Sequence, residues 1–163
     1  MTESLLPFYS FDSGAIINGR RDIFMPTTWA GLWTRIEAMI ATGQIRAVDE
    51  VKLEVTKKDD EAASWAMAQV GLFVPLTTDI QIATKQVLRA HPKLLGIGGS
   101  PRNGADAFVI GLAIAQGGTV VTQEVPRNLD KPKIPDVCDA MGIRCLTLPH
   151  FVNEQNWTVS MEG

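Results

Sequence analysis

The sequence predicts one α/β domain over residues 1–163, with a three-layer α/β/α architecture and a central parallel sheet of about four to five strands. Three observations lead to this prediction. Strand-like segments alternate with segments of helical periodicity, which is typical of a parallel sheet with crossover helices. The chain has 163 residues, the usual size of a single domain. Hydrophobic residues make up 45% and charged residues 20% of it, a composition that favours a compact globular protein.

The N-terminal part predicts a strand, a short helix and a long helix. Residues 8–12 form an apolar, aromatic run that favours a strand, and turn residues then lead into a helical segment with apolar residues at 15–17. From Trp29 to Ile40 apolar residues recur at helical spacing, which predicts the long helix. Its N-cap is expected at Thr27 or Thr28.

The middle part predicts one further strand and three helices. Residues 45–48 favour a strand, and Asp49 is expected to cap the helix that follows it. Asp59 or Asp60 is expected to start the next helix. The third helix is predicted over 78–90, where a His-Pro pair ends it because the residue before proline avoids the helical region.

The C-terminal part predicts two strands and two helices separated by loops. Glycine and proline punctuate this part and mark where the elements end. In chain order, the predicted segments are a loop over 96–104, a buried helix over 105–116, a strand over 119–122, an exposed connection over 126–135, a short helix over 135–141, a strand over 144–148 and a tail with Phe151 and Trp157.

The composition argues against several classes of protein. The two histidines and two cysteines are too few for a histidine-rich transition-metal site, and the spacing of Cys138 and Cys145 matches no redox or zinc motif, so reduced, buried thiols are expected. The longest strongly apolar run, residues 108–115, is far shorter than the ~20 residues of a membrane helix. The first residues lack the features of a secretory signal. A cytoplasmic protein without a membrane segment is therefore expected.

The formal charge of −3 argues against a broad basic surface for nucleic acid. An acidic centre that carries metal is a different case. Two divalent ions add +4, and −3 + 4 gives +1, which reverses the sign of the field at the site. A phosphodiester can therefore still approach such a centre.

Four acidic residues stand where an apolar run ends or a helix opens: Asp12, Glu54, Asp106 and Glu124. The carboxyl ends of parallel strands lie along one edge of a sheet, so acids far apart in sequence can meet there. Carboxylate oxygens are suitable ligands for hard divalent cations. The chemistry that needs such a set is phosphodiester cleavage assisted by Mg²⁺ or Mn²⁺.

Each of these acids also has a purely structural interpretation. Asp12 can serve as a turn or capping residue, and Asp106 can stabilise a helix N-terminus through the helix dipole. Glu54 can pair with lysines of its own helix, and Glu50, one turn earlier, competes with it for the role of ligand. Glu124 can simply be an exposed loop residue.

The order and spacing of the acidic segments resemble the PIN-like domain family, whose best-known members are the ribonuclease toxins of type II toxin-antitoxin systems. Two further segments resemble a poorly characterised branch of that family. The segments that carry the resemblance are YSFDS at 9–13, VKLEV at 51–55, ADAFVIGLA at 105–113, VVTQE at 120–124, and, for the branch, DEAASWA at 60–66 and KIPDVC at 133–138.

The resemblance implies a metal-dependent endoribonuclease, the toxin of such a system, with Mg²⁺ or Mn²⁺ as cofactor. It implies Asp12, Glu54 and Asp106 as metal ligands and Glu124 as a variable fourth, which is longer than the aspartate common in the family and would reach the metal through water. Ser13 and Thr122 would then supply hydroxyls that orient ligands and water.

RNA, a small antitoxin protein and a second copy of the chain are the expected partners. The helix predicted over 29–40 offers an apolar face for a homodimer. Basic residues on loops and helix ends are candidates for contacts to the RNA backbone. These candidates are Arg20, Arg21, Lys57, Lys58 and Arg102.

Two other functions compete with this one. The segment 96–104 resembles the phosphate loop of flavodoxin-like reductases, which would bind a flavin or nucleotide at a helix start. Such a loop normally follows the first strand, and Pro101 stands where the dinucleotide pattern needs its last glycine. The other alternative is a PIN-like interaction protein without catalytic activity.

Overall fold

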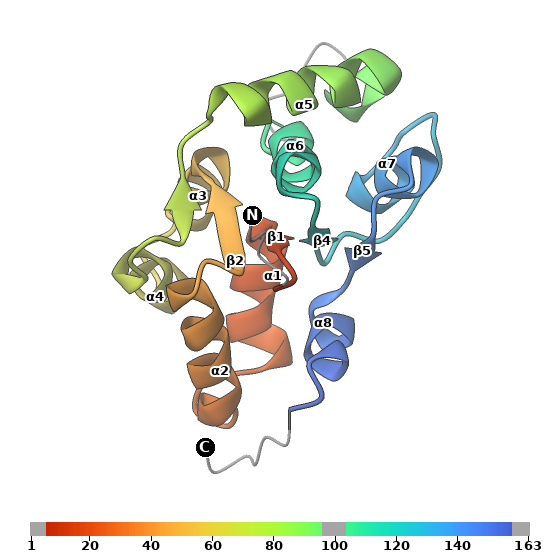
Figure 1. Ribbon diagram of the computed structural model, residues 1–163. Helices are drawn as coiled ribbons and strands as arrows, with labels where there is room; N and C mark the ends of the chain where they lie inside the picture. Colours follow the sequence, from red (N-terminus) through yellow and green to blue (C-terminus); the bar gives the residue numbers. More distant parts are fainter. Residues whose placement is uncertain (1–5, 96–103, 158–163) are drawn as a thin grey trace.

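A five-stranded, fully parallel sheet forms the centre of the molecule, as seen in a computed structural model that describes residues 6–95 and 104–157 (Figure 1). The strand order is β3-β2-β1-β4-β5, so the order reverses between β1 and β4. The strands are β1 (Tyr9–Phe11), β2 (Ile45–Val48), β3 (Phe73–Val74), β4 (Thr119–Val121) and β5 (Cys145–Leu146).

Helices cover both faces of this sheet. In Figure 1, α5, α6 and α7 lie above the sheet, and α1, α2 and α8 lie below it. The predicted three-layer α/β/α architecture is therefore confirmed. The helical elements are α1 (Ser13–Asn18), the π-helical turn η1 (Gly19–Ile23), α2 (Ala30–Ala41), α3 (Asp49–Val55), α4 (Glu61–Ala68), α5 (Thr78–Ala90), the 3₁₀ turn η2 (Pro92–Leu95), α6 (Asp106–Gln116), α7 (Ile134–Met141) and α8 (Leu148–Glu154).

The central strand β1 is buried on both faces because layers of helices lie above and below it. On one face its rings meet Phe151 of α8 edge to face, with centroids 4.7 Å from Tyr9 and 5.2 Å from Phe11. The Tyr9 hydroxyl donates to Glu154 Oε2 at 2.6 Å. The aromatic run of β1 is thus held by α8, which lies near the other end of the sequence.

On the other face α6 packs against the sheet, and α5 packs on α6. The two helices approach closely at Gly111, where a Cβ atom would overlap the Thr84 hydroxyl and lie 3.1 Å from the Ile80 carbonyl oxygen. Helix α6 ends at Gly117, whose φ of 64° belongs to the left-handed region that favours glycine. Glycine at 111 therefore sets the distance between two helical layers.

Three elements differ from the sequence-based expectations. The segment β3 has two residues and half-buried side chains, too short a run for a strand signal. The expected C-terminal tail is a helix, α8, whose N-cap Thr147 accepts a hydrogen bond from the His150 N–H at 3.3 Å. The turn η1 continues directly from α1, although no helical repeat marks it.

Two predicted helix caps are also wrong. The N-cap of α2 is Trp29 and not Thr27 or Thr28, because Met25 O accepts the N–H groups of both Thr28 and Trp29 and holds these residues in a turn. Asp49 is the first residue of α3, and Val48 occupies the cap position. The cap predicted at Asp60 is confirmed, since its Oδ1 accepts the Ala63 N–H at 3.0 Å.

Across residues 6–95 and 104–157, none of the helices has the length and apolar character needed to cross a lipid bilayer.

Candidate functional site

The four predicted acids lie around the carboxyl ends of the central strands. Asp12 follows β1, and Glu124 comes shortly after β4. These strands are neighbours, and the strand order reverses between them. In open α/β sheets such a reversal leaves a crevice at the strand ends, where ligands bind.

Asp12 is buried, and its carboxylate is held by the end of β4. Thr122 Oγ1 donates to Asp12 Oδ2 at 2.9 Å and accepts the N–H of Glu124 at 3.2 Å. Asp12 stands at the N-cap position of α1, yet its side chain makes no capping hydrogen bond there. Its position is therefore fixed by Thr122 and not by the turn role that the sequence left open.

The pKa of Asp12 is raised to about 7, and burial is the largest cause of this shift. The charges of Glu124 and, to a smaller extent, Glu54 contribute to the rise, and hydrogen bonds from Thr122 and Ser13 oppose it. An acid with this pKa holds its negative charge at a considerable cost in free energy at neutral pH.

Asp106 is buried at the first position of α6, directly after the N-cap residue Ala105. Its pKa is raised to about 9 by burial, the largest cause, together with the charges of Glu124, Asp12 and Glu54. The charge of Lys133 lowers the pKa in part. Since each of the other three predicted acids acts on Asp106, all four stand within electrostatic range of one another.

Glu54 reaches the same site from α3. Burial is the largest cause that raises its pKa, and the charge of Glu124 raises it as well. A hydrogen bond from the Ser13 hydroxyl and the charge of Lys57 lower it. Glu54 Oε1 is buried without a hydrogen-bond partner within the described part of the chain, and so is Glu50 Oε2. Glu50, however, is not among the charges that act on Asp12 or Asp106.

Glu124 is half-buried and is held by the segment that leads into α7. Its Oε1 accepts the N–H of Ile134 at 2.9 Å. This contact fixes one carboxylate oxygen toward the protein. It also brings the KIPDVC segment, which the sequence marked as a branch motif, against the acidic site.

The donor set fits a hard divalent cation by its chemistry. In residues 6–95 and 104–157 no three acidic, histidine or cysteine side chains are already arranged as metal ligands. Asp12 and Asp106 are nevertheless buried, with raised pKa values, and the half-buried Glu54 has an orphaned oxygen. Divalent cations prefer oxygen donors of this kind, and their charge would offset the mutual repulsion of the carboxylates.

A cavity of about 340 Å³ opens beside Asp12 and Glu124. Sequence reasoning missed most of its lining. Three of the lining residues could have been predicted to lie together. Gly14, Asn18 and Asp22 follow one another at intervals of four residues, the spacing of side chains on one face of a helix. The lining residues are Asp12, Ser13, Gly14, Asn18, Asp22, Ile23, Gln123 and Glu124.

The predicted RNA-contacting residues occupy different places. Arg21 is half exposed at the cavity and donates to Asp22, one of its lining residues. Lys57 is exposed and near enough to Glu54 to lower its pKa. Lys58 lines a separate cavity beside α4. Arg102 lies outside the described residues.

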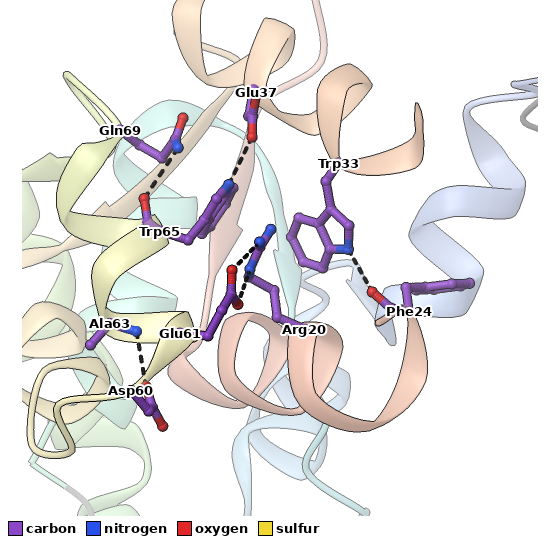
Figure 2. Close-up of polar contacts among 9 residues, drawn as sticks. All are labelled: Arg20, Phe24, Trp33, Glu37, Asp60, Glu61, Ala63, Trp65 and Gln69. Carbon is purple, nitrogen blue, oxygen red and sulfur yellow. Dashed lines mark hydrogen bonds and ion pairs between the residues drawn. The ribbon is translucent and has the colours of Figure 1, made fainter. Parts of the chain in front are cut away.

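Arg20 is buried in a cage of side chains from η1, α2 and α4 (Figure 2). Its guanidinium donates twice to Glu61, with Nε 2.7 Å from Oε1 and Nη2 2.5 Å from Oε2. It stacks between the rings of Trp33 and Trp65, 4.7 Å and 4.5 Å from their centroids. The indole N–H groups donate to the Phe24 carbonyl oxygen and to Glu37. The guanidinium of Arg20 is therefore engaged inside the fold by Glu61 and the two tryptophan rings.

Lys133 is a basic residue near the site that was not among those predicted from the sequence. It directly precedes Ile134, which holds Glu124, and its charge acts on Asp106. Lys133 is the first residue of the KIPDVC segment, which carries the family resemblance. Its positive charge in that segment could have indicated a basic residue near the acids.

The flavin-binding alternative gains no support from the described residues. The phosphate loop would need a strand before it, whereas the 3₁₀ turn η2 precedes residue 96. The segment 96–103 itself lies outside the described residues. The strand order also differs from the 2-1-3-4-5 order of flavodoxin-like proteins.

Comparisons with known proteins place the chain in a family and support its fold. Residues 9–159 match a family described as a domain of unknown function, DUF4411. No curated protein matches the chain in sequence. Among solved structures, the crystal structure of FitAcB from Neisseria gonorrhoeae is similar, with a TM-score of 0.51 and 13% identity over 88% of this chain and 99% of that one. This likeness is one of fold, and it confirms the PIN-like three-layer fold that the sequence predicts.

Proposed function

The chain belongs to the DUF4411 family, and we propose that it is a metal-dependent ribonuclease that uses Mg²⁺ or Mn²⁺. The observation that carries this proposal is the burial of Asp12 and Asp106 beside the half-buried Glu54 and Glu124, where the strand order reverses. Burying like charges is unfavourable unless a cation compensates them. A fold does not by itself need such a cluster.

Asp12, Glu54 and Asp106 would hold the metal, with Glu124 as a fourth acid. When bound, a divalent metal of this kind activates water and stabilises the leaving oxygen of a phosphodiester. The chain's own residues prepare the site for it. Thr122 orients the Asp12 carboxylate, the Ile134 N–H fixes one oxygen of Glu124, and Ser13 donates to Glu54.

The family resemblance supports a role as the toxin of a type II toxin-antitoxin system. In this proposal a small antitoxin protein binds over the acidic site and blocks access to the cavity beside Asp12. Copurification of the chain with the product of a neighbouring gene tests this role. The proposed homodimer is tested separately, by the mass of the purified chain in light scattering.

Replacing Asp12 or Asp106 with asparagine tests the ribonuclease proposal directly. Each change removes a charge while keeping the size of the side chain, so we expect RNA cleavage in Mn²⁺ to fall by about 100-fold or more. Asp130→Asn is the matched control, since the Asp130 side chain is 90% exposed and lies 3.5 Å from Lys93 Nζ.

Cleavage is measured on single-stranded RNA, and Mn²⁺ binding is measured by calorimetry. Wild-type protein that binds no Mn²⁺ and cleaves no RNA would contradict the proposal. Mn²⁺ binding that depends on Asp12 and Asp106, without cleavage of any RNA, would favour the alternative of a PIN-like interaction protein.

A further inference from the structure

Lys133 stands on the segment that reaches the acidic site from α7. The N–H of the next residue, Ile134, donates to Glu124 Oε1 at 2.9 Å, so the backbone here lies against one of the four acids. The helix α7 packs against α6, which begins with Asp106. Lys133 therefore directly precedes the residue that holds Glu124, on a segment leading into a helix that packs against the helix of Asp106.

The backbone around Lys133 is held without the use of its side chain. The Asp136 carboxylate accepts the N–H of Lys133 at 2.8 Å and the N–H of Arg127 at 2.9 Å. Because backbone donors occupy this carboxylate, its negative charge is already engaged. The preceding residue, Pro132, is buried.

The charge of Lys133 points to the acidic site. The side chain is half-buried, and its charge acts on Asp106 in opposition to burial and to the three other acids. In the described part of the chain, no ion pair engages the Lys133 ammonium group. The site thus contains a cation that no carboxylate binds directly.

We propose that the Lys133 ammonium group binds the phosphate of the substrate backbone, an inference that rests on the ribonuclease function proposed above. A phosphodiester brings a negative charge to a site that already holds four carboxylates. A positive charge near Asp106 and Glu124 favours a phosphate there, and it selects no particular base because every nucleotide carries the same phosphate. The KIPDVC motif then has two functions, because Ile134 holds an acid and Lys133 binds the substrate.

RNA binding by Lys133→Gln tests this inference, with Lys131→Gln as the matched control. Lys131 is exposed two residues away, and its N–H bonds to Asn128. Binding is measured by fluorescence anisotropy of a labelled 12-nucleotide single-stranded RNA in Ca²⁺ at several salt concentrations. We expect Lys133→Gln to weaken binding by about threefold to tenfold and to reduce the salt slope by about one, whereas the control stays near wild type.

Mn²⁺ binding in the absence of RNA gives a second readout. Removing a positive charge near Asp106 removes repulsion toward the metal, so Lys133→Gln is expected to bind Mn²⁺ about threefold to tenfold more tightly at low ionic strength. Lys133→Arg keeps the charge and is expected to retain both RNA and Mn²⁺ affinity. A merely structural role of Lys133 would weaken both affinities or change neither.

The outcomes separate this inference from the ribonuclease proposal. If the wild type binds and cleaves RNA but Lys133→Gln behaves like Lys131→Gln, the inference is overturned and the ribonuclease function stands. If the wild type binds no RNA, both are overturned. If Lys133→Gln does not fold, Lys133→Met, which keeps the alkyl chain, provides the same comparison.

Discussion

At the scale of single residues, the acidic site depends on how its carboxylates are buried. Asp106 has the larger shift, with a pKa near 9 in the metal-free fold against 3.8 for an ordinary aspartate. A folded-state pKa above the unfolded value means that the fold binds the proton more tightly. The stability linked to this proton is complete below about pH 4 and is lost as the pH rises toward 9.

We therefore expect metal-free wild type to lose stability relative to Asp106→Asn as the pH rises from 5 to 9. The difference in unfolding free energy should change by at most ~1.4 kcal/mol per pH unit, since asparagine carries no charge at any pH. Urea unfolding in EDTA at several pH values measures this difference. Parallel pH profiles for the two proteins would contradict it, and Asp130→Asn should follow wild type.

The residues of the site were predictable from the sequence to an uneven degree. Asp12 and Glu124 follow apolar strand segments, and parallel strands necessarily share an edge, so their meeting could be foreseen. The burial of Arg20 could not, because it requires Trp33 and Trp65 from two different helices to meet around it. An arginine that follows a short helical segment looks like a surface cation until those helices are placed.

At the scale of elements, the Arg20 cage joins η1 to α2 and α4. The turn η1 also supplies Asp22 and Ile23 to the wall of the cavity. Lysine cannot reproduce a planar, bidentate and stacked contact. We expect Arg20→Lys and Glu61→Gln each to lower the unfolding free energy by about 1–3 kcal/mol. This loss is smaller than for a fully buried ion pair, because the Glu61 side chain is 61% exposed.

Denaturant unfolding measures this loss, and Arg35→Lys on the exposed face of α2 is the control, with an expected change within about 0.5 kcal/mol. Hydrogen exchange adds a local readout. The amides of η1 should exchange faster in Arg20→Lys, while those of β1 and β4 should not. Unchanged exchange in η1 would show that the cage does not hold this wall.

The contact between α5 and α6 gives a prediction with a definite sign. Alanine normally favours a helix over glycine by about 1 kcal/mol. At Gly111, however, the added methyl group would overlap Thr84, and we expect Gly111→Ala to destabilise the protein by about 1–3 kcal/mol. Gly14→Ala is the control, since its nearest contacts are an ordinary 3.6 Å; thermal unfolding should show it equal to or more stable than wild type.

Elements with regular patterns were predictable, and elements fixed by neighbours were not. The apolar repeat of α2 and the alternating order of strands and helices are properties of the sequence itself. In contrast, β3 is a strand because β2 lies beside it. The helix α8 had a local signal in Thr147 and Pro149, which form an N-cap followed by a proline in the first turn.

At the scale of the whole molecule, metal binding and stability should be coupled. A ligand that binds only the folded state stabilises it by about 2.7 kcal/mol at a concentration 100 times its dissociation constant. We expect Mn²⁺ or Mg²⁺ to raise the unfolding temperature of wild type in a concentration-dependent way. The shift should be lost in the double variant Asp12→Asn/Asp106→Asn, and an equal shift in that variant would place the metal elsewhere.

The packing of β1 against β4 and against Phe151 of α8 has a consequence for protein synthesis. Asp12 leaves the ribosome early, but its partner Thr122 and the helix that covers β1 are made more than 100 residues later. A nascent chain therefore carries an exposed central strand and no assembled acid cluster until the ribosome has passed Thr122 and α8. The proposed ribonuclease cannot cleave the messenger that encodes it before that point is reached.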